Sequence, residues 1–270
     1  SRWTHVAIVP DEKVESLIRA LLKAFESFGG VPLRAVFDNP KTIVISRTKE
    51  LVEWNATFVH VPVDYGFGVE LCWPRRANQK GSVENLVGWV KGSFFKVRRF
   101  HDRADLAQQL IAWLEEANLQ RPSRATNEVP AERMKVERER LSPLATPADD
   151  YPLRVAVTVG TTGFVEHERI RYSMPPTAIG IPGTLFLYPD RVRIVTRSGI
   201  EVEHPRRPAV GNTSYCSEHR VARLAAVHGQ RAKLYQKRQE ILELGPPAER
   251  LLTEWVHHPR INWKDQVEQL

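Results

Sequence analysis

Residues 33–38, LRAVFD, and residues 80–95, KGSVENLVGWVKGSFF, decide how this chain is expected to fold. The first stretch is short and apolar, with Gly-Gly-Val-Pro before it and Asn-Pro after it, so it predicts a buried strand that ends at Asp38. Open α/β sheets place their ligand sites at the carboxyl ends of strands. Asp38 is therefore a candidate functional carboxylate.

The second stretch predicts a helix that carries another candidate carboxylate, Glu84, near its start. Apolar side chains recur at helical spacing, and Glu84 falls at the rim of the buried face that they form: Val83, Leu86, Val87, Val90 and Phe94. Two carboxylates on separate elements are the ligands that a divalent cation prefers. Taken singly, Asp38 also fits a turn, and Glu84 also fits a helix that favours acids in its first turn.

The motifs FDNPK at residues 37–41 and KGSVEN at residues 80–85 resemble the sequences around the second and third catalytic acids of DDE transposases and integrases. The nearest resemblance is to the IstA family of insertion-sequence transposases, and it runs from Ser1 to about Leu144. It implies that Asp38 and Glu84 are catalytic and bind two Mg²⁺ or Mn²⁺ ions. The implied activity is metal-dependent cleavage and strand transfer at transposon ends by phosphoryl transfer.

The first residues are expected to form an edge strand, Arg2–Val9, and then an amphipathic helix, Asp11–Phe28. In the ribonuclease-H-like fold that the resemblance implies, three antiparallel strands precede this helix and the first of them carries the first catalytic Asp. Only the last of these strands is found here. The core is therefore expected to be N-terminally truncated, with the first Asp upstream of Ser1; Asp11 and Asp64 are the alternatives for a third acid.

Basic residues crowd around Glu84, and the whole chain has a net charge of +7 and a pI near 9.5. Such an excess of cations indicates a polyanionic partner, and interleaved aromatics are typical of nucleic-acid surfaces. A solvated face is the ordinary explanation for any one of these cations, and Trp89 and Phe94 are expected in the core. The residues expected to contact DNA are Lys41, Arg75, Arg76, Lys80, Lys91, Lys96, Arg98 and Arg99.

The expected architecture is an α/β ribonuclease-H-like, integrase-like catalytic core followed by a small all-β barrel and C-terminal helices. Between the two acids, a helix is expected over Leu51–Phe58 and an extended run over Val59–Val63. Later helices are expected at Ala104–Asn118 and Val129–Leu141. Expected domain boundaries are 1–102 for the core, 103–150 for a helical linker, 151–210 for the barrel and 211–270 for the C-terminal helical segment.

Alternating hydrophobicity begins after the Pro- and Asp-rich residues 145–152 and predicts several short strands. Closing them into a barrel would remove exposed strand edges, as in the barrel of Mu-like and IstA-like transposases. The predicted strands are Leu153–Val159, Phe164–Ser173, Thr184–Tyr188, Arg191–Thr196 and Ile200–Glu203. Helices are expected over Glu218–Leu244, with a break at His228-Gly229, and over Ala248–His257 and Trp263–Leu270.

Two cysteines provide no disulfide framework, and no apolar run reaches the roughly 20 residues that span a bilayer, so a cytoplasmic, nucleoid-associated protein without membrane contact is expected. A zinc site is not expected, because only Cys216 and His219 approach the spacing of a ligand pair; the other candidates are His204 and His228.

The resemblance implies double-stranded DNA, comprising transposon ends and target, as the partner, with at least a dimer on DNA and an ATPase helper protein. The alternatives are a non-catalytic DNA-binding or assembly module with a degenerate core and a nuclease of the ribonuclease H class. The nuclease leaves the barrel and helical tail unexplained.

Overall fold

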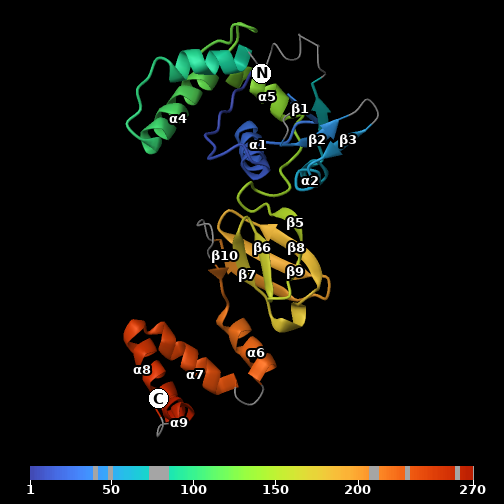
Figure 1. Cartoon of the computed structure of the whole chain (residues 1–270). Helices are drawn as coiled ribbons and strands as arrows, with labels where there is room; N and C mark the ends of the chain where they lie inside the picture. Colours follow the sequence, from blue (N-terminus) through green and yellow to red (C-terminus); the bar gives the residue numbers. More distant parts are fainter. Residues whose placement is uncertain are drawn as a thin grey trace. The chain divides into compact units, whose positions relative to one another are not determined.

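The computed structural model describes residues 1–38, 42–47, 51–72, 85–206, 213–228, 232–258 and 262–269 (Figure 1). The chain divides into two compact units, Ser1–Leu153 and Arg154–Leu270. Each unit combines helices and strands, so the chain is of mixed α/β class.

Helix α1 (Val14–Phe28) organises the first unit. Ile18, Leu22 and Phe25 recur at helical spacing and are buried, which explains why this stretch folds as an amphipathic helix. The helix ends at Gly29, whose backbone adopts a left-handed conformation with φ of 83° and donates to the carbonyls of Phe25 and Glu26. The helix predicted over Asp11–Phe28 is thus confirmed, with a start three residues later.

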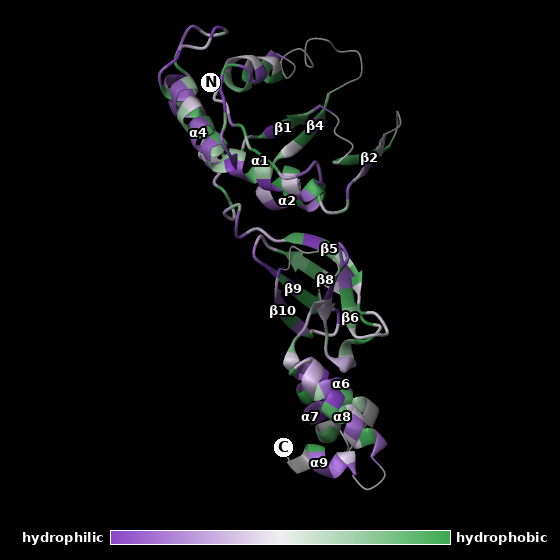
Figure 2. Ribbon diagram, turned by 60° about the vertical axis from the view of Figure 1, so that its left-hand side comes forward, coloured by the Kyte–Doolittle hydropathy of each residue, from purple (hydrophilic) through white to green (hydrophobic). Residues whose placement is uncertain are grey.

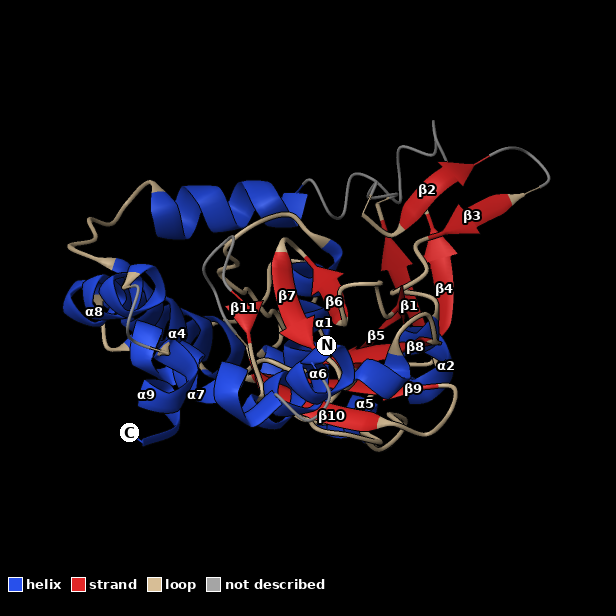
Figure 3. Ribbon diagram, turned by 60° about the horizontal axis from the view of Figure 1, so that its bottom comes forward, coloured by secondary structure: helices blue, strands red, loops and turns tan. Residues whose placement is uncertain are grey.

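Strand β1 (Arg34–Phe37) follows α1 and pairs in parallel with β4 (Gly68–Leu71), from Arg34 opposite Gly68 to Phe37 opposite Leu71 (Figure 3). The predicted strand is confirmed, but its predicted burial is wrong: Leu33 is 77% exposed and Val36 is 51% exposed. Within the described residues β1 pairs with β4 alone, so its second edge and one face are left uncovered.

The segment between β1 and β4 differs from the sequence prediction. Strand β2 (Val44–Arg47) pairs antiparallel with β3 (Val52–Trp54), where a helix over Leu51–Phe58 was expected. Helix α2 (His60–Tyr65) replaces the expected extended run Val59–Val63. Pro62 lies in the first turn of α2, where no backbone donor is needed, and Val61 and Tyr65 are buried.

The remaining helices of the first unit agree with the sequence prediction. Residues 85–90 are helical and continue into a π-helical turn, η1 (Lys91–Phe95). Helices α4 (Arg103–Leu119) and α5 (Pro130–Arg138) confirm the helices predicted there. Asp102 caps α4, since its side chain accepts a hydrogen bond of 2.8 Å from the backbone N–H of Asp105.

The first residues form no strand within 1–13, contrary to the expected edge strand Arg2–Val9. Instead, the backbone of Thr4 exchanges two hydrogen bonds of 2.8 Å with the buried side-chain amide of Asn118 on α4. The amide takes the place of a neighbouring strand, because it satisfies both the N–H and the C=O of Thr4.

The strands of the second unit lie in two sheets. The larger has the order β10-β9-β8-β5, and the smaller has the order β11-β7-β6. The described strands do not form the predicted closed barrel, because hydrogen bonding is interrupted between the two sheets. Their bounds are β5 Leu153–Thr158, β6 Phe164–His167, β7 Ile170–Ser173, β8 Pro182–Leu187, β9 Arg191–Thr196, β10 Glu201–Pro205 and β11 Thr213–Ser214, with a 3₁₀ turn, η2, at Pro176–Ala178.

The predicted single strand Phe164–Ser173 is a hairpin in the structure, β6 paired antiparallel with β7. The chain turns at Glu168 and Arg169, whose φ values are 49° and 66°. Two consecutive residues with positive φ fit the tight turns that join twisted strands, and those turns normally use Gly or Asn. The sequence therefore carries no turn signal at this position.

The described residues of the second unit also form the helices α6 (Ser217–His228), α7 (Ala232–Glu243), α8 (Pro246–His257) and α9 (Trp263–Gln269). These confirm the predicted helices. Their purple and green residues alternate along α7 and α8 in Figure 2, as expected for amphipathic helices. Leu234, Leu252 and Val267 bring α7, α8 and α9 together in a small core.

Candidate active site and nucleic-acid surface

Asp38 lies directly after the last residue of β1, at the carboxyl end of a parallel strand pair. The strand end is fixed from both sides: the carbonyl of Phe37 accepts a 2.9 Å hydrogen bond from the N–H of Cys72, and the Phe37 ring packs edge-on against Phe58 at 5.7 Å. The Asp38 side chain is exposed, and it makes no hydrogen bond or ion pair within the part of the chain that the structure describes. The strand end thus presents to solvent a carboxylate that is unengaged within the described residues.

The second predicted carboxylate, Glu84, lies outside the described residues, as do four of the predicted DNA contacts: Lys41, Arg75, Arg76 and Lys80. Among the residues that are described, no three His, Cys, Asp or Glu side chains are grouped as metal ligands. The pairing of Asp38 with Glu84 stays a prediction.

Asp11 and Asp64, the alternatives for a third catalytic acid, both accept hydrogen bonds in the structure. Asp64 accepts a hydrogen bond of 2.6 Å from the hydroxyl of Tyr151. Asp11 accepts from the Ser16 hydroxyl at 2.6 Å and from the backbone N–H of Lys13 at 3.1 Å, and these bonds lower the pKa of its carboxyl. Both acids therefore stabilise local structure.

The described cations of the predicted DNA surface lie on the helix of residues 85–95, which carries Lys91, and on the turn and loop that follow it. Lys91, Lys96 and Arg99 are exposed, so they are available to a ligand. Arg98 has a different environment: its guanidinium donates to the carbonyl of Ser93 at 3.0 Å and lies 5.1 Å from the centre of the Phe94 ring. Arg98 therefore braces the π-helical turn, and its assignment to DNA stays a prediction.

A buried aromatic cluster holds this helix against α4. Val90 and Phe94 pack against Leu110 and Trp113, and Val6 and Ile8 of the N-terminal segment pack around the same cluster. Phe94 is in the core, as expected, whereas Trp89 is 39% exposed and its ring lies 4.7 Å from that of Trp113. The predicted buried face is incomplete, because Leu86 and Val87 are exposed.

The second unit contains a buried polar cluster that sequence reasoning missed, which we call the Ser/His joint: Ser173, His204, Ser214, Cys216 and His219. His204 donates through Nε2 to the Ser173 carbonyl at 2.8 Å, and its Nδ1 lies 3.2 Å from the Ser214 hydroxyl. The Ser173 hydroxyl lies 2.9 Å from Nδ1 of His219 and accepts from the Cys216 N–H at 2.9 Å.

The Ser/His joint ties α6 to both sheets, because its members come from β7, β10, β11 and the start of α6. Burial lowers the pKa of both imidazoles below their ordinary value. His204, Cys216 and His219 are three of the four residues considered above as zinc ligands, together with His228. In the structure the imidazole nitrogens that face the cluster are hydrogen-bonded to serines.

Among the residues that the structure describes, no helix combines the length and the apolar character needed to cross a bilayer. No protein-family profile matches the chain.

Several curated proteins are similar in sequence to this chain. The transposase for insertion sequence element IS21 of Pseudomonas aeruginosa is 31% identical over 206 residues, which is 76% of this chain and 53% of that protein. The transposase for IS640 of Shigella sonnei is 34% identical over 139 residues, 51% of this chain and 44% of that protein. The transposase for IS232 of Bacillus thuringiensis is 28% identical over 226 residues, 80% of this chain and 50% of that protein. The chain thus spans about half the length of these relatives.

Proposed function

The chain belongs to the family of insertion-sequence transposases that includes the IS21 transposase, and from this premise we propose that it is the catalytic part of a DDE-type transposase. Its proposed activity is metal-dependent cleavage and strand transfer of DNA at transposon ends by phosphoryl transfer. One observation carries the proposal: in a chain of this family, the carboxylate of Asp38 stands exposed at the carboxyl end of a parallel strand, with no partner among the described residues.

A ribonuclease-H-like core is the fold that we propose for the first unit. The order α1, β1, β2, β3, α2, β4 and the parallel pairing of β1 with β4 support it. Parallel strands are ordinarily covered on both faces, whereas Arg34 and Val36 leave one face of β1 exposed. Further strands beside β1 would pair with its open edge and bring another acid next to Asp38.

The residues present fit a divalent metal of the Mg²⁺ or Mn²⁺ class. Asp38 offers an exposed, hard oxygen donor, and the sequence motif proposes Glu84 as its partner. When bound, two such ions supply Lewis-acid stabilisation of the attacking and leaving oxygens of an in-line displacement. Asp11 and Asp64 fit less well, because their oxygens already accept hydrogen bonds.

The chain's own groups then have distinct roles. Asp38 follows the end of β1 and would hold the divalent ion, while Lys91, Lys96 and Arg99 would bind neighbouring phosphates of the backbone. No covalent nucleophile is required, because the attacking group in this class of reaction is water or a DNA hydroxyl. A non-catalytic assembly module would keep the cations but would not depend on Asp38.

The partners proposed are double-stranded DNA, a second copy of the chain and an ATPase helper protein. Transposon ends act in pairs, so at least a dimer is expected on DNA. The apolar side chains of α4 that pack within the first unit, Leu110 and Trp113, are not available to a partner, whereas Ile111 and Leu119 are exposed. Light scattering of the DNA complex at micromolar concentration tests this; a monomer would contradict the dimer.

A DNA cleavage and strand-transfer assay tests the proposed chemistry. The assay uses a chain that carries a third acid as well as these residues, with Asp38→Asn and Glu84→Gln as variants. Each variant should lower the rate at least about 100-fold, the scale for removing one preorganised electrostatic group, while DNA affinity stays nearly unchanged. Asp64→Asn is the matched control, since the amide oxygen still accepts from Tyr151. Full activity in Asp38→Asn would refute the proposal.

A further inference from the structure

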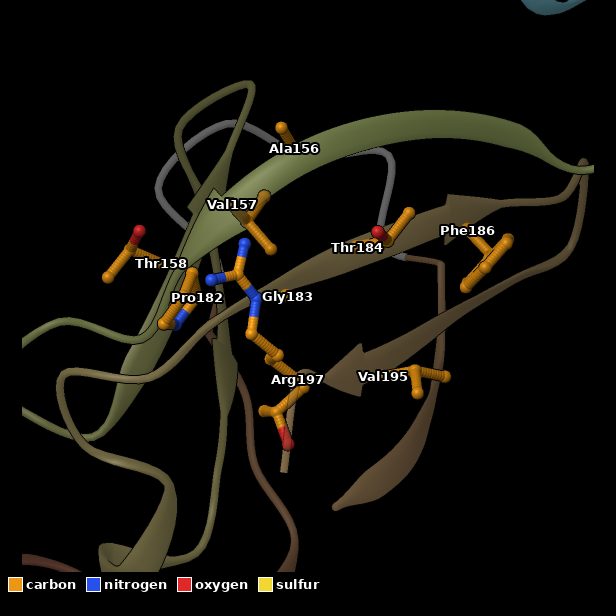
Figure 4. A pocket seen from close by; sticks show the side chains of 10 residues that line it. Ala156, Val157, Thr158, Pro182, Gly183, Thr184, Phe186, Val195 and Arg197 are labelled. Carbon is orange, nitrogen blue, oxygen red and sulfur yellow. The ribbon is translucent and has the colours of Figure 1, made fainter. Parts of the chain in front are cut away.

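The outer face of the larger sheet in the second unit carries an open groove that the proposed chemistry does not use. Its volume is about 650 Å³, and residues of β5, β8 and β9, together with Arg197 just beyond β9, line it (Figure 4). Thr158, Thr184, Phe186 and Arg197 supply its principal side chains. The groove lies outside the predicted active site.

Strand alternation builds this groove. Leu185 on β8 and Ile194 on β9 point into the core and are buried, so their neighbours Thr184 and Val195 face outward. Thr184 and Val195 are cross-strand partners in the floor of the groove. A Cβ at Gly183 would lie 2.5 Å from the carbonyl oxygen of Val195, so any side chain there would force β8 and β9 apart.

Arg191 and Arg193 on the outer face of this sheet are paired with acids of β10, whereas Arg197 has no such partner among the residues that the structure describes. Arg191 lies 3.6 Å from Glu203 and Arg193 lies 3.4 Å from Glu201, so β10 compensates both. Arg193 also covers the Phe186 ring at 4.9 Å. Arg197 is exposed, and within the described residues its guanidinium has neither a hydrogen-bond partner nor an ion-pair partner. The groove therefore keeps one uncompensated cation beside two hydroxyl groups.

We propose that this groove binds the phosphodiester backbone of DNA, with Arg197 as the charged contact and Thr158 and Thr184 as hydroxyl donors; this rests on the proposed function, which makes DNA the substrate. A guanidinium presents a planar fork of donors that matches phosphate, and Thr hydroxyls are ordinary donors to phosphate oxygens. The groove is open to solvent, as binding of a polymer backbone requires. Contacts of this kind position DNA without reading its sequence.

Equilibrium binding to two duplexes of unrelated sequence, measured by fluorescence anisotropy across a salt series, tests this site. Arg197→Gln should weaken binding to both duplexes equally, by about fivefold to tenfold, and should make the salt slope shallower by about 0.9, the contribution of one phosphate contact. Thr158→Val with Thr184→Val keeps the side-chain shapes and should also weaken both duplexes equally. The matched control is Arg250→Gln, which removes an exposed charge from α8, outside the groove.

The outcomes separate this inference from the proposed function. A wild-type chain whose DNA affinity is flat with salt contradicts DNA as the substrate altogether. If the salt dependence of the wild type is steep, DNA stands as the substrate. If Arg197→Gln and Arg250→Gln then reduce this dependence equally, or if neither variant reduces it, the groove is not the DNA-binding site and the inference is overturned. Binding of polyglutamate as tightly as DNA, with the same dependence on Arg197, would make an acidic peptide the occupant and would also overturn the inference.

Discussion

The two units differ in where their chemically versatile side chains lie. In the second unit, Ser173, His204 and His219 are buried and hydrogen-bonded within the Ser/His joint. In the first, Asp38 is exposed at a strand end and is unengaged within the described residues. Buried polar groups are costly unless paired, so the joint stabilises one structure, whereas an exposed carboxylate contributes little to stability and stays available to a ligand. The polar groups that hold the fold are thus distinct from those proposed for chemistry.

The largest effect on stability is expected from the aromatic cluster of the first unit. Trp113→Ala removes a fully buried ring and should lower the free energy of unfolding by about 3–5 kcal/mol. Because each unit has its own core, calorimetry should show the loss in one transition only. Ile111→Ala, on the exposed side of the same helix, is the control and should cost less than about 0.5 kcal/mol. Equal shifts in both transitions would show that the two cores are not independent.

A smaller loss is expected in the Ser/His joint. Ser173→Ala leaves the Cys216 N–H and Nδ1 of His219 without their hydroxyl partner, which should cost about 1–3 kcal/mol. Chemical denaturation measures it. Ser198→Ala is the control, because Ser198 is exposed and its partner Thr196 keeps hydrogen bonds to Ile200. A Ser173→Ala variant as stable as the control would mean that the joint is not a stabilising network.

The stability of the second unit should also depend on pH. Burial lowers the folded pKa of His204 and His219, so the unfolded chain binds more protons as the pH falls below the ordinary histidine value of 6.5. Stability is therefore fully present above that pH and is lost on acidification towards the lowered folded pKa values, by at most about 1.4 kcal/mol per pH unit for each histidine.

Besides burial, three groups bear on the pKa values of these imidazoles: hydrogen bonding to Ser173 raises both, His219 lowers that of His204, and Glu218 acts on His219. Glu218 raises the pKa of His219 and so opposes the effect of burial, which remains the larger cause. Unfolding curves at pH 7.5 and 5.5 measure the change. The double variant His204→Gln with His219→Gln should remove most of this pH dependence; a wild type equally stable at both pH values would contradict the assignment.

The smallest effect on stability is expected at Asp38 itself. Asp38→Asn alters an exposed side chain without a partner in the described structure, so the free energy of unfolding should change by less than about 0.5 kcal/mol. Thermal unfolding in the absence of metal measures this change. A decrease in the free energy of unfolding above about 1 kcal/mol would show that Asp38 stabilises the fold, as Asp64 does. The first unit would then no longer differ from the second in having a polar group that is free of a structural role.

Strongly periodic segments could be predicted from the sequence, and short ones could not. Helix α1 follows a sustained helical pattern, and β9 follows strict alternation. Leu51–Phe58 fits both periods; its strand is set by pairing with β2, which a local pattern does not contain. The run Val59–Val63 is β-branched and contains Pro, yet the burial of Val61 and Tyr65 outweighs that local preference.

The candidate site was predictable only in part, for the same reason. The sequence places Asp38 at a strand end, and the structure agrees. Exposure of β1 and the bracing role of Arg98 depend on tertiary contacts, so residue type alone did not reveal them. The Ser/His joint brings Ser173 next to residues 31 and 46 positions away, and no spacing rule predicts such a cluster.

The central claim is that Asp38 and Glu84 together bind the divalent ions that support DNA phosphoryl transfer. A crystal structure of the chain with Mn²⁺ and a transposon-end duplex, located through the anomalous signal of manganese, tests it most directly. The claim predicts that both carboxylates contact manganese, with the two ions about 3.5–4 Å apart. Carboxylates of Asp38 and Glu84 more than about 10 Å apart, outside any two-ion site of this spacing, or manganese held by Asp11 or Asp64 instead, would contradict it.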